Sequence, residues 1–321
     1  MRAIVVGISG QDGYHMAELL CAKGISVLGL TSNLDRANRQ LLGFKAEGLI
    51  LQAFDYSEVG GFSRVVELFR PDLVFNFAAK ATGQGMFDMP YEISRLNGAF
   101  IIDILEAIRT SERRAVITFC QASSSEMFGN VAEAPQSEIT PLRPKSPYGA
   151  AKSYGHNMIG IYRVAYGLRC CSAILYNHES TRRTPDFVTM KIAHGAASIK
   201  LGLSDSLLVN NLDSSRDWGY APEYVQGMYL MAMAGARRDY VLSTGTLHTV
   251  RHLCEVAFSH VGLDYMKYTK VNPSAHRVVD SLNLVGDSSL IARELGWVAR
   301  RTIDDIMVEM VNHQLTRLRM L

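Results

Sequence analysis

Two residues near the middle of the chain have types and a spacing that suit proton transfer. Tyr148 and Lys152 lie four positions apart in the segment Ser146–Lys152. On a helix this spacing places both side chains on one face, one turn apart. A phenol ordinarily titrates near ~10, and a neighbouring ammonium lowers that pKa because it favours the phenolate. An ordinary surface helix can carry the same pair by chance, so this interpretation needs support from other parts of the chain.

A polar loop after a predicted strand offers two more reactive side chains. The loop Gln121–Gly129 contains Ser124 and Glu126. Ligands of open α/β sheets bind at the carboxyl ends of the strands, so we expect this loop to lie at a binding site. The Ser124 hydroxyl can bind a substrate oxygen beside the Tyr148 phenol, and the Glu126 carboxylate is a candidate general base. The alternative is a serine-rich loop that only forms a turn or caps a helix.

Three glycines near the start of the chain predict a nucleotide site. Gly7, Gly10 and Gly13 lie between a predicted strand, Arg2–Val6, and a predicted helix, Gly13–Gly24. Glycines at this position allow a tight turn and let a pyrophosphate approach backbone N–H groups at the helix N-terminus. The spacing is GxxGxxG rather than GxGxxG, and the alternative is a glycine-rich turn without a ligand.

The end of the second predicted strand bears on the choice of nicotinamide cofactor. An acidic residue there binds a ribose 2′-hydroxyl, whereas an arginine accommodates a 2′-phosphate. Ser32, Asn33 and Arg36 could hold a phosphate, and Asp35 could instead hold a hydroxyl. We therefore favour NADP, with NAD as the alternative. Arg36 and Arg39 could also be solvated surface charges.

The order of the predicted elements is typical of a Rossmann-like, doubly wound parallel α/β sheet with helices on both faces. Apolar strands are predicted at Arg2–Val6, Ser26–Leu30, Leu49–Ala53, Asp72–Asn76, Ala115–Cys120 and Arg169–Tyr176. Helices are predicted at Gly13–Gly24, Glu58–Phe69, Pro90–Thr110 and Tyr148–Tyr166. Residues 1–176 therefore form the expected dinucleotide-binding domain.

The remaining residues, 177–321, predict a smaller mixed α/β lobe for the substrate, with some chain crossing back to the sheet. Its expected helices are Phe187–Leu201, Pro222–Ala234, Thr249–Val261, Ser288–Leu295 and Ile303–Leu318, and its short strands are Ser206–Asn211 and Tyr240–Ser243.

Composition excludes several classes of protein. The 321 residues are 48% hydrophobic and 20% charged, as in globular proteins. A net charge of +2 gives no reason to expect a nucleic-acid or membrane partner. No segment has the apolar length of a membrane span. The five cysteines lack metal-binding spacing, so we expect no metal site and reduced thiols in the cytoplasm.

Together these segments resemble extended short-chain dehydrogenases/reductases, and in detail the GDP-mannose 4,6-dehydratase family. Gly10–Gly13 resembles the family's GQDG loop, Gln121–Gly129 its QASTSELYG, and Ser146–Lys152 its SPYAxAK. Leu175–Ser180 is similar to its LFNHES, and Arg182 and Arg183 follow as they do in the family. Similar segments extend from Gly7 to roughly Trp297, which is nearly the whole chain.

The resemblance implies a dehydration in which the cofactor is recycled. Tyr148 would take the proton of the sugar C4 hydroxyl while hydride passes to the nicotinamide, and Lys152 would lower the tyrosine pKa and hold the nicotinamide ribose. Ser124 replaces a family threonine and would bind O4. Glu126 would take the C5 proton, made acidic by the C4 ketone, and help expel the C6 hydroxyl as water. The hydride would then return to C6.

The resemblance also implies two sets of binding residues. The cofactor set is Gly7, Gly10, Gln11, Asp12, Gly13, Ser32, Asn33, Arg36, Asp55, Tyr56, Ala78, Ala79, Tyr148, Lys152, Asn177 and His178. The substrate set is Lys80, Ser124, Glu126, Asn177, Val188, Lys191, Arg216 and Arg277. For His178 we expect a packed or hydrogen-bonded role rather than catalysis.

Several segments depart from the family pattern. Ser32 and Asn33 replace the paired arginines that bind the 2′-phosphate, and Thr31–Leu51 is shorter than the family segment that reaches a neighbouring subunit. We expect a homodimer or homotetramer, with the helices Pro90–Thr110 and Tyr148–Tyr166 as the dimer surface. The family's QSHV loop reads Lys80–Gly83 here, so a sugar other than mannose is plausible.

Two other functions remain open at this point. A nucleotide-sugar 4-keto reductase or epimerase could use the same fold, because related reductases also carry a glutamate at the position of Glu126. A catalytically silent nucleotide sensor is a third hypothesis, against which the intact Ser124, Glu126, Tyr148 and Lys152 argue.

Overall fold

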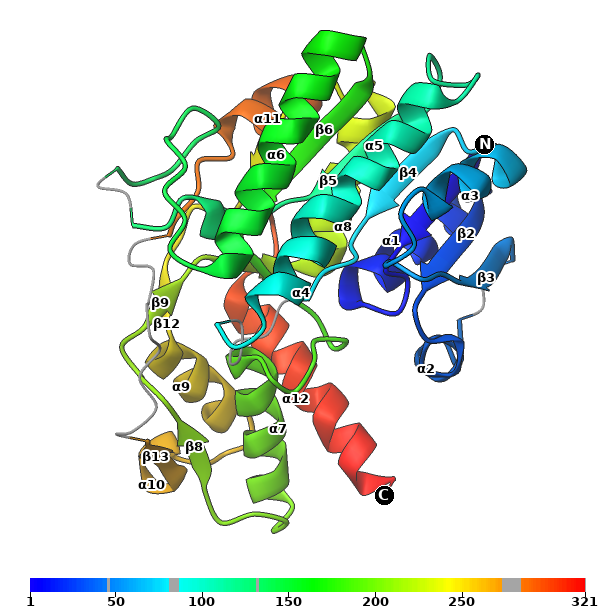
Figure 1. Cartoon of the computed structure of the whole chain (residues 1–321). Coiled ribbons are helices and arrows are strands. Elements are labelled where there is room, and N and C mark those ends of the chain that lie inside the picture. Colours follow the sequence, from blue (N-terminus) through cyan, green and yellow to red (C-terminus); the bar gives the residue numbers. More distant parts are fainter. Residues whose placement is uncertain (45–46, 81–86, 131–132, 273–283, 321) are drawn as a thin grey trace.

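A seven-stranded parallel sheet forms the centre of the protein (Figure 1). The computed structural model describes residues 1–44, 47–80, 87–130, 133–272 and 284–320. The strand order is β11-β6-β5-β4-β1-β2-β3, and every pairing is parallel. The strands are β1 (Arg2–Val6), β2 (Ser26–Thr31), β3 (Leu49–Ala53), β4 (Leu73–Asn76), β5 (Thr118–Ala122), β6 (Arg169–Leu175) and β11 (Tyr240–Leu242). The predicted Rossmann-like sheet is confirmed.

Both faces of the sheet are buried, as the apolar runs of its strands require. Successive residues of β1 alternate between two cores: Ala3 and Val5 belong to one, Ile4 and Val6 to the other. The first core lies under α1 (Gln11–Ala22), α8 (Ala221–Met233) and α11 (Ser289–Leu295). The second lies under α3 (Gly61–Phe69), α5 (Phe100–Thr110) and α6 (Pro147–Tyr166). Residues alternate in this way because successive side chains of a strand point to opposite faces.

A third core lies beside the sheet and belongs to the C-terminal part of the chain. It joins α7 (Val188–Lys200), α9 (Val250–His260) and α12 (Ile303–Arg319), which lie below the sheet in Figure 1. Short strands link its loops: β7 (Asn177–Glu179) pairs with β10 (Trp218–Tyr220), β9 (Ser215–Arg216) with β12 (His248–Thr249), and β8 (Leu207–Val209) with β13 (Thr269–Val271). The single-turn helix α10 (Tyr265–Tyr268) precedes β13. The C-terminal part also returns to the sheet, because β11 pairs with β6.

Several predicted boundaries differ from the structure. The helix predicted from Glu58 starts at Gly61, because Gly60 before it has a left-handed backbone (φ +77°). The strand predicted from Ala115 starts at Thr118, because reverse turns at Arg113 occupy the residues before it. The helix α2 (Leu34–Gln40) was not predicted at all.

The helix predicted over Pro90–Thr110 is interrupted. Between α4 (Pro90–Ser94) and α5 lies one π-helical segment, Arg95–Ala99. Such wide turns often occur at functional sites. Asn97 in this turn is buried, and its amide binds both backbone groups of Lys80, accepting from Lys80 N (3.0 Å) and donating to Lys80 O (3.2 Å). The π-helical segment thus anchors the backbone at the exit of β4.

Candidate active site

The start of α6 is held against the loop after β5. Ser146 caps the helix, since its hydroxyl accepts a hydrogen bond from Gly149 N (3.0 Å), and Pro147 occupies the first turn. A Cβ on Gly149 would lie 2.6 Å from Glu126 O. Glycine at this position therefore allows the backbone of α6 to approach the backbone of Glu126. The first turn of α6, with Tyr148, and the single 3₁₀ turn Ser125–Met127, with Glu126, consequently meet at the carboxyl edge of the sheet.

Ser124, Glu126 and Tyr148 interact with one another. The Ser124 hydroxyl accepts a hydrogen bond from Glu126 N (3.2 Å). Burial raises the pKa of Tyr148 to about 12; a hydrogen bond with Ser124 and the charge of Arg183 act in the opposite direction, while the Glu126 charge adds to the increase. The structure thus brings together the serine, the glutamate and the tyrosine that the sequence singled out.

Lys152 is buried close to Tyr148. Its ammonium lies 5.6 Å from the centre of the Tyr148 ring and donates a hydrogen bond to Ala122 O (2.8 Å). Burial lowers the pKa of Lys152 to about 8. In the protein alone the pKa of Tyr148 is raised overall, because desolvation of the phenolate outweighs the charges around it, and the lowering of this pKa by Lys152 stays a prediction.

The glycine loop is packed so closely that side chains are excluded. Gly7 has a φ of +81°, and a Cβ there would lie 2.7 Å from Ala78 N. A Cβ on Gly13 would lie 2.3 Å from Gly7 O. This packing places Gly7 against the exit of β4, at Phe77 and Ala78, and places Gly10 and Gly13 against Gly7. The orphan N–H groups at the start of α1 are then available to an anion, so the loop fits a dinucleotide's pyrophosphate.

Five of the predicted cofactor residues lie at the ends of β2 and β3. The Asn33 side chain is used within the fold, because its Oδ1 caps α2 by accepting a hydrogen bond from Arg36 N (2.8 Å). Ser32 and Arg36 are exposed beside it. After β3, Asp55 accepts a hydrogen bond from Ser57 N, and the Tyr56 hydroxyl donates to Leu30 O (3.3 Å).

A polar network ties the start of α1 to the segment after β6. His178 Nε2 lies 3.0 Å from Asp12 Oδ2, and its Nδ1 donates to Tyr176 O (2.7 Å). Gln11 donates to His178 O (3.0 Å) and accepts from the Ser180 hydroxyl (2.9 Å). The expected hydrogen-bonded role of His178 is confirmed.

The contact between Asp12 and His178 favours the charged form of both side chains. Burial raises the pKa of Asp12, but the charge of His178 and its hydrogen bond outweigh this and lower it to about 2. For His178, burial lowers the pKa, and the charge and hydrogen bond of Asp12 reverse the effect and raise it. The pair therefore joins the glycine loop to β7 by a charge-assisted hydrogen bond.

Four of the predicted substrate residues come from three separate elements of the C-terminal part of the chain. Asn177 starts β7, Val188 and Lys191 lie in the first turn of α7, and Arg216 is a buried residue of β9. The Lys80 ammonium does not face a site alone, because it forms an ion pair with Glu92. Arg277 lies outside the described residues.

Two residues outside the predicted set contribute to the site. Arg183 pairs with the buried Glu179 (Nε to Oε2, 2.9 Å), and its charge lowers the pKa of both Tyr148 and Asp12. Asp217, next to Arg216, is fully buried and accepts hydrogen bonds from Thr244 N (2.9 Å) and Gly245 N (2.9 Å), which fixes the loop after β11. The sequence signal for Arg183 was the pair of adjacent arginines after Ser180. Asp217 directly follows Arg216 in a segment that resembles the family, but it was not singled out.

The structure also bears on metals and membranes. Among the residues that are described, no three His, Cys, Asp or Glu side chains gather in a way that could bind a metal ion. None of the helices in the same ranges combines the length and the apolar character that a membrane span needs.

The buried charge of Lys152 predicts a pH-dependent stability. Its pKa is about 8 in the folded protein and 10.5 when unperturbed. Between these values the unfolded chain holds a proton that the folded chain has lost, so the free energy of unfolding gains a contribution that rises with pH. Relative to Lys152→Met, the cofactor-free wild type should therefore become more stable from pH 8 to pH 10 in urea unfolding experiments. A constant difference between the two proteins across this range would contradict the assignment.

Known proteins are similar to this chain along nearly its whole length. The family model for GDP-mannose 4,6 dehydratase matches residues 4–310. GDP-mannose 4,6 dehydratase 1 of Arabidopsis thaliana is 36% identical over 98% of this chain and 89% of its own length. GDP-mannose 4,6-dehydratase of Vibrio cholerae is 32% identical over 98% of this chain and 94% of its own length.

Solved structures agree on the fold. UDP-glucose 4-epimerase of Thermus thermophilus, in complex with NAD, has a TM-score of 0.84 at 25% identity and covers 98% of this chain and 99% of its own. dTDP-glucose 4,6-dehydratase of Bacillus anthracis has a TM-score of 0.85 at 15% identity, and the match covers 99% of this chain and 98% of its own. From the glycine loop to α12, the chain belongs to the GDP-mannose 4,6-dehydratase family.

Proposed function

We propose that the protein removes water from GDP-mannose and forms a GDP-4-keto-6-deoxy sugar. The observation that carries this proposal is the contact between α6 and the loop after β5. It joins Tyr148, which suits oxidation at a carbinol, to Glu126, which suits removal of a proton from carbon. Family membership and the names of the relatives point to the same reaction.

Each side chain has a distinct proton to move. Tyr148 takes the proton of the C4 hydroxyl, and Ser124 holds O4 through a hydrogen bond. Glu126 then takes the C5 proton, whose acidity rises once C4 is a ketone, and delivers it to the departing C6 hydroxyl, which leaves as water. When C6 receives hydride, Tyr148 gives the proton that it took from the C4 hydroxyl to C5, and the protons balance. The charge of Arg183 favours the phenolate form of Tyr148 during the first step.

The cofactor is a nicotinamide dinucleotide, which accepts hydride from C4 and returns it to C6 when bound. The start of α1 and the loop at Ala78 and Ala79 would hold its pyrophosphate and nicotinamide ends, and Lys152 its nicotinamide ribose. We favour NADP over NAD, because Ser32 and Arg36 are exposed at the end of β2 and an arginine there suits a 2′-phosphate.

The nucleotide part of the substrate would meet the C-terminal lobe, residues 177–321. Lys191 in the first turn of α7 and Arg216 in β9 supply positive charge for a diphosphate, and Asn177 supplies hydrogen-bond donors. The buried Asp217 keeps the strand of Arg216 in place.

The five cysteines are free thiols, which is compatible with a reducing cytoplasmic location.

We also propose that the protein associates through α6. Tyr154, Ile161 and Val164 on this helix are 49%, 53% and 86% exposed, and Tyr91 on α4 is 77% exposed. Such an apolar surface is typical of a subunit contact. A second copy related by twofold symmetry would cover it and give a dimer.

Substitution at Glu126 separates dehydration from oxidation. Glu126→Gln should reduce turnover of GDP-mannose by a factor of about 10²–10⁴, the usual contribution of a general base. Loss of water is measured by mass spectrometry of the product. The matched control is Glu112→Gln at an exposed position after α5, which should retain wild-type turnover. Unchanged turnover in Glu126→Gln would contradict the assigned base, and stoichiometric oxidation of reduced cofactor by the wild type with a 4-keto substrate would favour a reductase.

Substitution on the exposed face of α6 tests the association. Val164→Asp should halve the mass found by sedimentation velocity, because it places a charge in the apolar contact. Val59→Asp, at a residue 87% exposed before α3, should leave the mass unchanged. A wild type that sediments as a monomer, or equal masses for the wild type and both variants, would argue against this surface.

A further inference from the structure

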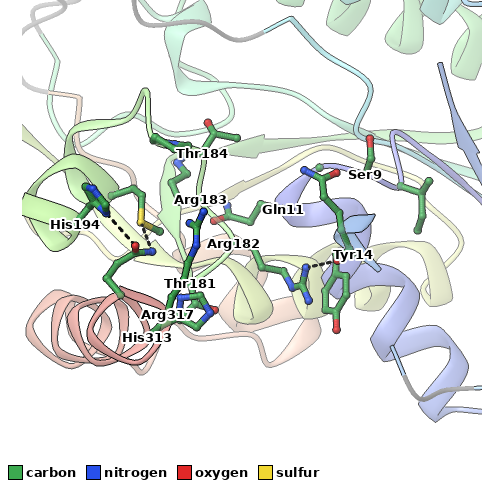
Figure 2. A pocket seen from close by; sticks show the side chains of 16 residues that line it. Ser9, Gln11, Tyr14, Thr181, Arg182, Arg183, Thr184, His194, His313 and Arg317 are labelled. Carbon is green, nitrogen blue, oxygen red and sulfur yellow. Dashed lines mark hydrogen bonds between the residues drawn. The ribbon is translucent and has the colours of Figure 1, made fainter. Parts of the chain in front are cut away.

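A cationic cavity opens beside the glycine loop, and none of the roles given so far uses its outer part (Figure 2). It has a volume of about 400 Å³. One wall is the start of α1, with Gln11 and Tyr14, and the opposite wall is the last part of α12, with His313 and Arg317 (Figure 2). Arg182 and Arg183, from the loop after β7, lie between these walls.

The cavity lining has an excess of positive charge. Arg182, Arg183 and Arg317 line it together with His194 and His313, and the lining contains no Asp or Glu. Arg183 is neutralised by Glu179. Within the described ranges, neither Arg182 nor Arg317 forms an ion pair with a carboxylate. Burial together with the charges of Arg317 and Arg182 lowers the pKa of His313. Two guanidinium groups therefore face this space without a counter-charge.

Arg182 is held in place rather than left in solvent. Its guanidinium lies 3.1 Å over the centre of the Tyr14 ring, and its Nη1 donates a hydrogen bond to Gln40 O (2.9 Å) at the end of α2. A guanidinium has five N–H donors, so a stacked arginine with one such bond retains donors for a ligand. Arg317 and Arg319 both stand in the last turn of α12, where basic residues are generally favourable, but only Arg317 of the two lines the cavity.

The cavity is adjacent to the expected position of the cofactor ribose. Ser9 lines the cavity, and its hydroxyl accepts a hydrogen bond from the hydroxyl of Thr31, the last residue of β2 (3.5 Å). Strand ends at this place in the fold meet the ribose 2′-position of a dinucleotide. Arg182 and Arg317 line the same cavity as Ser9, and guanidinium groups bind phosphate through paired N–H groups.

We infer that this cavity is a phosphate-binding site in which Arg182 and Arg317 bind the anion. The phosphate is either the 2′-phosphate of the cofactor or a group on a separate nucleotide, and both present the same dianion. The inference rests on the proposed function, because the 2′-phosphate can be the first source of the anion only if the glycine loop holds a dinucleotide. A separate nucleotide is the second source. The cavity adds to the positive charge of Arg36 at the end of β2, where Ser32 and Asn33 carry none.

Isothermal titration of the full chain with NADP and NAD tests the first source. If the 2′-phosphate enters the cavity, Arg317→Gln should weaken NADP binding roughly tenfold, the loss expected for one charge-assisted hydrogen bond, and leave NAD binding within about twofold. Arg182→Gln should act in the same direction, and Arg317→Lys should retain part of the affinity. The matched control is Arg319→Gln on the same helix, which should bind both cofactors as the wild type does.

Titration of NADP-saturated protein with inorganic pyrophosphate tests the second source. If a separate nucleotide phosphate is bound, the wild type and Arg319→Gln should bind this probe, and Arg317→Gln should bind it roughly tenfold more weakly. The inference is overturned if Arg317→Gln and Arg182→Gln change neither the NADP-to-NAD ratio nor the pyrophosphate affinity, or if Arg319→Gln changes them equally. Turnover of GDP-mannose by the wild type is measured separately. Its absence would contradict the proposed function and not the cavity.

Discussion

The close approach of α6 to the loop after β5 determines what this protein can do chemically. Gly149 allows the helix backbone to lie where a Cβ would be only 2.6 Å from Glu126 O. Ser146 and Pro147 fix the start of the helix at that point, so Tyr148 and Lys152 enter the site from one face of α6. Without this contact, the tyrosine and the glutamate would belong to separate parts of the sheet edge. Because the backbone of α6 touches the backbone of the loop after β5, one site can move both the proton of a sugar hydroxyl and a proton from a neighbouring sugar carbon.

A second contact joins the two halves of the site across a large separation in sequence. Asp12 at the start of α1 pairs with His178 in β7, and Gln11 with Ser180. The pair holds the cofactor loop against the segment that leads to the substrate lobe. Because both charges are buried and bonded to each other, removing one partner would leave an uncompensated charge. The orientation of a sugar relative to a nicotinamide would therefore depend on this pair as much as on the residues that touch the ligands.

Much of this arrangement could be predicted from the sequence, because it follows from local patterns. Apolar strands alternating with helices predicted six of the seven strands of the sheet at or near their positions, together with the return of the chain to it. The glycine loop and the pair Tyr148 and Lys152 were recognisable because their spacing is fixed by one turn or one helix. By contrast, α2 and the π-helical turn depend on single side chains, Asn33 and Asn97, whose partners are known only from the fold.

Electrostatic properties were the least predictable part of the site. The spacing of Tyr148 and Lys152 suggested a lowered phenol pKa, but burial dominates both groups and cannot be read from spacing. The roles of Arg183 and Asp217 also depend on distant partners, Glu179 in β7 and the loop after β11. The cationic cavity is a clearer case still, because Arg182 and Arg317 are far apart in the chain and meet only when α12 packs beside α7.

The central claim is an internal transfer of hydride from C4 to C6 of one sugar, with a proton removed from C5 between the two steps. The most direct measurement is an NMR analysis of the product formed from GDP-mannose that carries deuterium at C4, with the cofactor present in catalytic amount. The account predicts a 4-keto product with the deuterium at C6 and no net change in the cofactor. Deuterium that accumulates in reduced cofactor, or that stays at C4, would contradict it.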